Sequence, residues 1–368
     1  MCFYKIIIFL QRGASMNMRV MLLHLAIPVY TFGMLNQEAL NKFVRSYEVV
    51  HIIPHDGERT HSLLYEPKSN QLIAAIDQDL IPFNCVTYEG KPTFIGKDMQ
   101  GLTLNPDKNI FYGREASPTR TVFVGSIQDG ACRVSEQPWT GRALAYNTTD
   151  KTLCIGGLHR NITLVDEHGQ ESSWNVLSGN NAYINNISAV CCNEAKNAIY
   201  VGSEEGKVEK WNTSGECVTK INAGTYISPL LCDQNSGHLY LNPNKRGILQ
   251  RYDANLENME EISYAGISTS TYSFTHNTIS KLLCITSKTH KSEERGLEYN
   301  VHILHPDNPT IQCKISLSNL GQSVACNPIN GTFYVGSKKA IYVLKPKESY
   351  LALANQSAHT VFKIKAKY

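Results

Sequence analysis

Residues 198–217, AIYVGSEEGKVEKWNTSGEC, decide the fold of this 368-residue chain. In one interpretation, Gly202, Ser203 and Gly206 form a loop that wraps an anionic ligand. In the other, the stretch is two short strands and two turns, one unit of a repeated structure. A phosphate-binding loop leads from a strand into the N-terminus of a helix, whereas residues 207–211 alternate like another strand. The stretch therefore favours a strand repeat.

The same frame recurs seven times along the chain. Each unit has an apolar strand that ends in an acidic or amide residue, followed by a second strand centred seven positions later. Such residues suit tight connections because their side chains bind the neighbouring backbone. The repeat spacing is about 39 to 50 residues, which accommodates four short strands and their loops. The turn residues are Glu66, Asn105, Asn147, Asn193, Asp233, Asn277 and Asn327, and the second strands are centred on Ile73, Tyr112, Cys154, Tyr200, Tyr240, Cys284 and Tyr334.

Two further sequence columns, which were not used to set the alignment, test it. A large apolar residue stands three positions before every turn residue, and another stands six positions after it. Seven matches in seven at both columns are not expected by chance in a chain with 42% hydrophobic residues. The first column is Leu63, Leu102, Leu144, Val190, Leu230, Phe274 and Val324, and the second is Leu72, Phe111, Leu153, Ile199, Leu239, Leu283 and Phe333.

The repeat predicts an all-β fold. A four-stranded sheet cannot bury both of its faces alone, but sheets arranged radially bury their faces against each other and expose only short edges. We therefore predict a seven-bladed β-propeller of four-stranded antiparallel blades over residues 47–368. Residues 1–46 form a short apolar or helical extension in this interpretation.

The chain resembles the seven-bladed propellers of the WD-repeat and quinoprotein-like (YVTN-type) superfamilies over roughly residues 48–368. The frame Tyr200-Val201-Gly202-Ser203 and its echo at residues 334–337 carry the resemblance. Three third strands end in degenerate versions of the Trp-Asp dipeptide, but no true Trp-Asp pair is present and no Gly-His dipeptide stands at its usual place. The three versions are Trp211-Asn212, Val165-Asp166 and Tyr252-Asp253.

Closure of a propeller ring requires one blade to contain strands from both chain ends. Tyr47–Ile53 is the N-terminal candidate, and its partner is either Ala340–Leu344 or Tyr350–Ala354. The terminal segment His359–Lys365 competes for the same edge, so the sequence leaves the closure undecided.

The N-terminal extension leaves two hypotheses open. Residues 20–35 are apolar and follow the basic Arg19, but they are interrupted by His24, Pro28 and Gly33 and fall short of the roughly 20 apolar residues that a membrane span needs. They act as an export signal in one hypothesis; in the other, the first residues are misassigned and the true start is Met16 or Met18. Apolar residues at helical spacing then predict one helix packed on the main domain, with a membrane-surface anchor as the alternative. These residues are Leu35, Ala39, Leu40, Phe43 and Val44.

Charge and cysteine content limit the function classes. The formal net charge of +3 does not favour nucleic acid, which binds clustered Lys and Arg. The 11 cysteines contain no paired CxxC spacing, and several lie in apolar runs, which favours free core cysteines in a reducing, cytoplasmic compartment. We expect a monomer that does not associate with membranes; export remains the alternative if residues 18–35 are a signal.

Candidate metal and catalytic motifs are weak in this sequence. His51, His55 and Asp56, with His61 beyond, have the residue types of a zinc site, but they lie in an extended pattern that does not bring their rings together. Cysteines occupy the same repeat position at Cys192, Cys232 and Cys326, where the other blades have a mostly apolar set typical of a core. No nucleophile elbow or Ser-His-Asp set is recognisable. We predict no catalytic residue, no metal and no cofactor.

A binding surface is better supported. Connections from the fourth strand to the next first strand, and from the second to the third, share one face of a propeller, here called the loop face. Aromatic residues and arginine anchor protein interfaces. The predicted binding residues are Trp139, Tyr183, Tyr226 and Tyr264 in the fourth-to-first connections, and Arg114, Glu204 and Glu205, with Lys338 and Lys339, in the second-to-third connections.

The expected function is a protein-interaction scaffold that uses this face. In an alternative interpretation, the tyrosines only pack between blades. The competing function is a metal-dependent hydrolase or lactonase that acts at the central channel.

Overall fold

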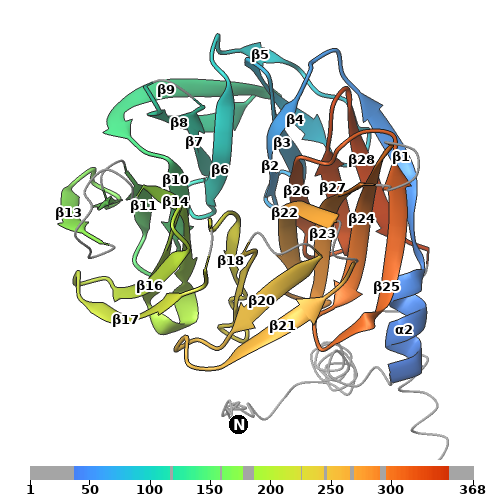
Figure 1. The fold of residues 1–368 in the computed structure, drawn as a ribbon. Coiled ribbons are helices and arrows are strands. Elements are labelled where there is room, and N and C mark those ends of the chain that lie inside the picture. The colour runs from blue at the N-terminus through green and yellow to red at the C-terminus, as the bar shows by residue number, and fades with distance from the viewer. Residues whose placement is uncertain are drawn as a thin grey trace, which may run out of the picture. The chain divides into compact units, whose positions relative to one another are not determined.

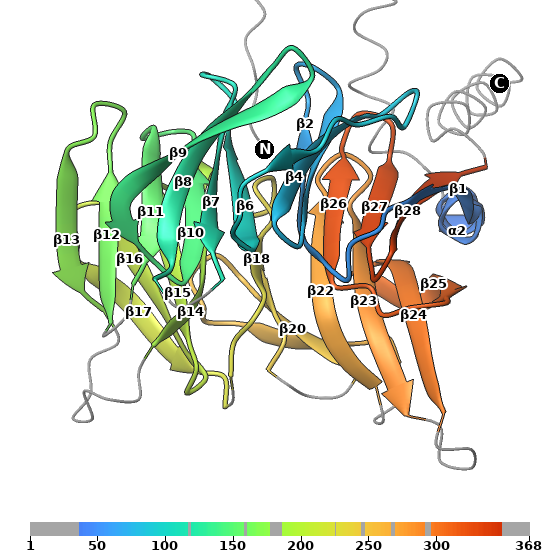
Figure 2. The same cartoon turned by 90° about the horizontal axis from the view of Figure 1, so that it is seen from above.

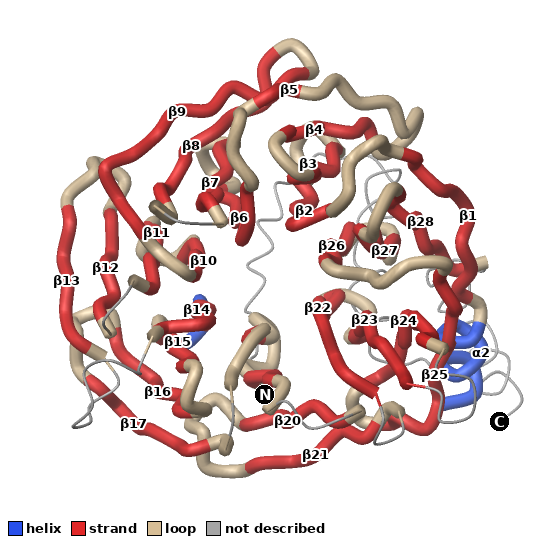
Figure 3. The backbone as a smooth tube through the Cα atoms, turned by 45° about the horizontal axis from the view of Figure 1, so that its top comes forward, coloured by secondary structure: helices blue, strands red, loops and turns tan. Residues whose placement is uncertain are grey.

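The computed structural model describes residues 37–116, 119–157, 160–176, 186–224, 226–243, 247–265, 269–290 and 296–347. Residues Val44–Lys347 form one compact unit that contains all the strands. These strands make seven four-stranded antiparallel sheets, arranged radially as the blades of a propeller (Figures 1 and 3). The structure confirms the predicted seven-bladed, all-β fold.

Six of the blades are meanders in which four strands follow one another in sequence order. Figure 2 shows this order for β6 to β9. The first three blades are β2 (Thr60–Glu66), β3 (Gln71–Ile76), β4 (Asp79–Asn84) and β5 (Thr93–Phe94); β6 (Met99–Asn105), β7 (Ile110–Glu115), β8 (Thr121–Gln128) and β9 (Ala131–Thr140); and β10 (Ala143–Asn147), β11 (Thr152–Gly156), β12 (Asn161–Val165) and β13 (Glu171–Asn175).

The next three blades follow the same plan, and the seventh takes its outer strand from the other end of the sequence. They are β14 (Ile187–Asn193), β15 (Ala198–Ser203), β16 (Lys207–Asn212) and β17 (Cys217–Asn222); β18 (Leu230–Cys232), β19 (Leu239–Leu241), β20 (Ile248–Tyr252) and β21 (Met259–Ser263); β22 (Thr269–Asn277), β23 (Leu282–His290), β24 (Leu297–His305) and β25 (Asn308–Leu317); and β26 (Ser323–Asn327), β27 (Thr332–Gly336), β28 (Ala340–Pro346) and β1 (Tyr47–Pro54).

The repeated turn residues each close the first hairpin of a blade. All seven are at most 6% exposed. In Asn147, for example, the side-chain oxygen accepts the backbone N–H of Thr149 at 3.0 Å and that of Asp150 at 3.4 Å. The other six likewise accept backbone N–H groups two or three residues further on. These buried oxygens are therefore satisfied locally, as the turn prediction requires.

A second regularity of these hairpins was not found from the sequence. The residue four positions after each turn residue has a positive φ, between 47° and 75°. Asparagine and glycine, which tolerate this left-handed backbone best, occupy five of the seven positions. The positions are Asn70, Asn109, Lys151, Asn197, Gly237, Lys281 and Gly331.

The predicted apolar columns form the core between blades. Every residue of the column six positions after the turn is at most 1% exposed. In the other column, four residues are buried and three, Leu102, Leu144 and Val324, are half-buried. The alignment therefore identified the inner hairpin of every blade.

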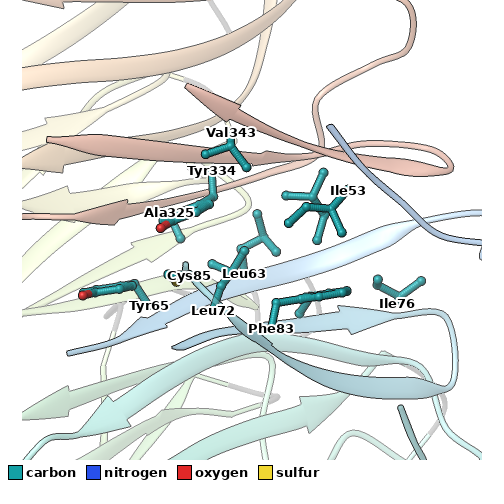
Figure 4. Close-up of a cluster of buried hydrophobic side chains, with 12 residues drawn as sticks. Ile53, Leu63, Tyr65, Leu72, Ile76, Phe83, Cys85, Ala325, Tyr334 and Val343 are labelled. Carbon is teal, nitrogen blue, oxygen red and sulfur yellow. The ribbon is translucent and has the colours of Figure 1, made fainter. Parts of the chain in front are cut away.

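The ring closes through β1. Tyr47–Pro54 pairs antiparallel with Ala340–Pro346 of β28, which decides between the alternatives that the sequence left open. Ile53 of β1 packs with Tyr334 and Val343 of blade seven and with Leu63 and Leu72 of blade one (Figure 4). The competing segments 350–354 and 359–365 lie outside the described residues.

The predicted helix is present as α2 (Gln37–Arg45). Its packing on the main domain remains a prediction. Among the residues that the structure describes, no helix is long and apolar enough to span a membrane. The apolar segment 18–35, Met16 and the end of the chain beyond residue 347 lie outside the described residues.

The cysteines within the described ranges are all free. Cys192 and Cys232 are buried, with 4% and 5% of their surface exposed. Cys326, at the equivalent position of the repeat in blade seven, is half-buried. Burial raises the pKa of the Cys232 thiol to about 12, so this side chain is protonated and packs as a small apolar group. The core interpretation of this cysteine column agrees with its position.

Candidate partner-binding face

Alternation of strand direction fixes which loops share a face. Each blade's first and third strands run one way and its second and fourth run the other. The second-to-third and fourth-to-first connections therefore lie at the same end, the loop face, and the buried turn residues lie at the opposite end, here called the turn face. Arg120, Arg142, Glu204 and Tyr226 all lie in connections of the loop face.

Arg114 is the last but one residue of β7, the second strand of blade two, next to these loops. Its Nη2 donates to Gln100 Oε1 at 3.1 Å and its Nη1 to the Glu115 carbonyl at 3.4 Å. Its Nε is buried and has no hydrogen-bond partner among the described residues. Burial, followed by repulsion from Arg120 and Arg142, lowers the pKa of the Arg114 guanidinium to about 10. The positive charge of Arg114 is therefore poorly compensated.

Arg120 and Arg142 bring two further guanidiniums to the same region. Loss of solvent and then repulsion from Arg142 lower the pKa of Arg120, whereas Glu204 opposes this shift. Arg142 Nη1 lies 2.6 Å from Glu204 Oε1. Within the residues that the structure describes, neither Arg114 nor Arg120 forms an ion pair, and Arg120 Nη1 is buried without a hydrogen-bond partner. We call Arg114, Arg120 and Arg142 the arginine cluster.

Glu204 joins blade four to this cluster. Besides its ion pair with Arg142, its Oε2 accepts a hydrogen bond of 3.0 Å from Asn186 Nδ2, at the start of blade four. The carboxylate is 28% exposed, so its interaction with Arg142 is only partly screened by water. Glu204 is therefore an internal example of a carboxylate bound to Arg142.

A small cavity opens on the same face at Tyr226, in the connection between blades four and five. The cavity has a volume of about 260 Å³ and is lined by Tyr226, Ser228, Asn242, Thr271 and Tyr272. Its two tyrosines are 46% and 41% exposed, whereas Asn242 is only 4% exposed. The Asn242 Oδ1 is buried and has no partner among the described residues, and its Nδ2 donates to the Thr271 carbonyl at 3.5 Å. This cavity offers apolar rings and an unused acceptor to a ligand.

Two of the predicted binding residues instead pack between blades. Trp139 is half-buried against the cluster of blades two and three, and its Nε1 donates to Glu171 Oε1 at 2.7 Å. Tyr264 is 3% exposed, with its ring edge-on to His302 and its hydroxyl bonded to Thr271. Their positions match the alternative in which aromatic residues fill the space between blades.

The remaining predicted residues differ in where their side chains are engaged. Arg114, Glu204 and Tyr226 lie at the loop face, where Glu204 pairs with Arg142 at 2.6 Å. Glu205 pairs with Lys207 at 3.4 Å, and Lys338 pairs with Glu58 at 2.6 Å. Tyr183 lies outside the described residues. Arg120 and Arg142 were not predicted from the sequence, although both lie in loops of the predicted face. Counting arginines over all such loops would have found them.

The three histidines considered for a metal site each contact a different residue. His51 stacks on Tyr88 with 4.3 Å between ring centroids, and His55 Nε2 lies 3.0 Å from Thr60 Oγ1. His61 Nε2 is 3.8 Å from Asp98. In the part of the chain that the structure describes, no group of three His, Cys, Asp or Glu residues is arranged to hold a metal ion.

Comparison with solved structures places the fold among known propellers. The β-propeller domain of Cps50 (Swd1) from Myceliophteria thermophila matches with a TM-score of 0.64 and 11% sequence identity, over 81% of this chain and 99% of that one. The chain thus has a seven-bladed β-propeller fold. No family model and no curated protein sequence matches it.

Proposed function

We propose that this protein is a protein-interaction scaffold that binds its partner on the loop face. One observation carries the proposal: three features lie at the same end of the ring. They are two exposed tyrosines, a buried oxygen without a hydrogen-bond partner among the described residues, and an arginine cluster with too few nearby anions to balance its charge. Tyrosine and arginine are the side chains most often found at the energetic centres of interfaces. A propeller fold serves binders and enzymes alike, so the proposal rests on this face and not on the fold.

The loop face also weighs against the competing hydrolase function. A metal-dependent propeller hydrolase needs carboxylates and amides that converge on a divalent ion. At the loop face of blades two to four the convergent side chains are guanidiniums, with Glu204 bound to one of them. This charge favours an anionic ligand over a cation.

The partner in this proposal is a protein, bound by a monomer in the cytoplasm. The small net charge of +3 does not favour a nucleic-acid partner. Light scattering on the purified chain tests the monomer, and a second copy seated on the loop face would appear as a concentration-dependent dimer.

The test is capture of cross-linked partners, identified by mass spectrometry, with three forms of the chain. The double variant Tyr226→Ala/Tyr272→Ala removes both exposed rings of the cavity. The control, Ile329→Ala, removes a 68% exposed apolar side chain from the turn face. We expect the double variant to lose partners that the control keeps, with both folded. Equal capture by all three forms would refute the proposal.

A further inference from the structure

We infer that the arginine cluster binds the anionic group of an acidic peptide segment in the partner, either a carboxylate or a phosphate. The inference deepens the proposed function and rests on it. It assigns the chemistry of the ligand, the three residues that hold its charge and the adjoining cavity that receives the neighbouring part of the peptide.

The first argument is charge compensation. Three guanidiniums gather within one region of the loop face, and Glu204 is ion-paired to one of them. A partly desolvated cation beside two like charges is unfavourable unless an anion is nearby. An anionic ligand would remove this repulsion, and guanidinium bonds carboxylate and phosphate oxygens in a bidentate manner.

The second argument is the unused hydrogen-bonding capacity. Arg114 Nε and Arg120 Nη1 are buried, and neither has a partner among the described residues. Buried polar groups in native proteins are almost always paired, so two such donors in one cluster indicate a group that is bound in the functional complex. A guanidinium has donors and no acceptor, so its partner must be an acceptor such as an anionic oxygen.

The third argument is the cavity beside the cluster. Asn242, which lines it, is 4% exposed and leaves its Oδ1 unpaired. A peptide offers a backbone N–H to this acceptor, while Tyr226 and Tyr272 contact its side chains. Tyr226 lies in a connection of the same face as Arg120 and Arg142, so one peptide segment lying on that face can reach both the cavity and the cluster.

The shape of the charged region favours a peptide over a nucleic acid. A nucleic-acid strand needs a track of positive charge along its backbone. Here the three arginines are confined to the end of β7 and to two connections of blade two, and Glu204 and Glu205 of blade four border them. A repeated phosphate backbone would meet these carboxylates, whereas a single anionic side chain avoids them.

The test measures fluorescence anisotropy of labelled probes with the full chain. The probes are hexaglutamate, a glycine hexapeptide with one phosphoserine, hexalysine and a ten-residue thymidine strand. We expect saturable binding of hexaglutamate or the phosphoserine peptide, weakened by salt, and no binding of hexalysine. Preference between the first two distinguishes a carboxylate from a phosphate. Tighter binding of the thymidine strand than of either peptide would overturn the inference.

Variants assign the binding to the cluster. The double variant Arg120→Gln/Arg142→Gln should lower the affinity for the anionic peptide by roughly tenfold or more, the loss expected when two charge-assisted contacts are removed. The matched control is Arg133→Gln, an exposed arginine on the outer strand of blade two, which should leave affinity unchanged. Equal affinity of the double variant and the control would overturn the inference.

A gain of affinity provides the readout that a structural role would not give. Glu204→Gln frees Arg142 from its internal carboxylate, so the anionic peptide should bind several-fold more tightly. Unchanged or weaker binding would contradict the inference. If partner capture is lost in Tyr226→Ala/Tyr272→Ala but persists in Arg120→Gln/Arg142→Gln, the proposed function stands and the assignment of an anionic ligand falls.

Discussion

The two ends of the propeller use polar side chains differently. At the turn face, a buried amide or carboxylate in each of the seven blades accepts N–H groups only two or three residues away. At the loop face, Arg114 and Arg120 leave buried nitrogens without partners among the described residues. The turn oxygens of the seven blades are satisfied within their own turns, whereas the two arginines of the loop face keep donors that a ligand can use.

This difference separates residues that stabilise the fold from residues available for binding. Removal of a side chain that is satisfied by its own turn costs stability, because the backbone N–H groups of the turn lose their acceptor. A side chain that is exposed or incompletely paired contributes little to stability but can contribute to an interface. The predictions below test this separation in order of expected effect.

Removal of a core ring at the closure should have the largest effect. Phe333 is fully buried, and its ring lies 5.6 Å from that of Tyr47 in the closing strand. We expect Phe333→Ala to lower the free energy of unfolding by about 3–5 kcal/mol, the usual cost of a phenylalanine-sized cavity. Urea denaturation followed by circular dichroism measures it; a loss below about 1 kcal/mol would contradict the closure described here.

Removal of a turn side chain should have the next largest effect. Asn147→Ala leaves the backbone N–H groups of Thr149 and Asp150 without their acceptor. We expect a loss of about 2 kcal/mol. Asn147→Asp keeps the acceptor and is the matched variant. If both variants unfold at the same urea concentration, local satisfaction of the turn is not the source of stability.

Acid should destabilise the fold through histidines that are buried neutral. His276 lies at the turn face, 3.4 Å from Asp233, and burial lowers its pKa below the ordinary value of about 6.5. The unfolded chain then binds a proton that the folded chain does not, so stability is full above about pH 6.5 and falls as the pH decreases below it. As the pH is lowered, the melting temperature of His276→Gln should fall less steeply than that of the wild type. The control His168→Gln, at an exposed histidine, should follow the wild-type curve. Parallel curves for both would exclude this role of His276.

Removal of an exposed ring at the loop face should have the smallest effect on stability. Tyr226 is 46% exposed, so Tyr226→Ala should change the free energy of unfolding by less than about 0.5 kcal/mol. Its effect should appear in partner binding. A destabilisation comparable to that of Asn147→Ala would place Tyr226 among the structural residues and remove the contrast between the two faces.

The turn face could be predicted from the sequence because its determinants are local. Asn147 and its partners lie within three residues, so spacing alone revealed them. Closure could not be predicted, because β1 and its competitors are all short apolar segments and the choice depends on pairing with β28 across nearly the whole chain.

The loop face was predicted only in part, because its contacts join different blades. Arg142 meets Glu204 across 62 positions of sequence, and no periodic pattern marks such a pair. Trp139 was predicted as a binding residue of a fourth-to-first connection, but it lies within β9 and its indole donates to Glu171 on the outer strand of the next blade. Packing between blades depends on how neighbouring sheets meet, which a repeat alignment does not contain.

The central claim is that the loop face binds and the turn face only stabilises. Partner capture by Tyr226→Ala/Tyr272→Ala, set against Ile329→Ala at the turn face, tests it most directly. The account predicts that the same identified partners disappear from the first variant and remain with the second, at equal melting temperatures. Partners that remain with the loop-face variant and disappear with Ile329→Ala would contradict it.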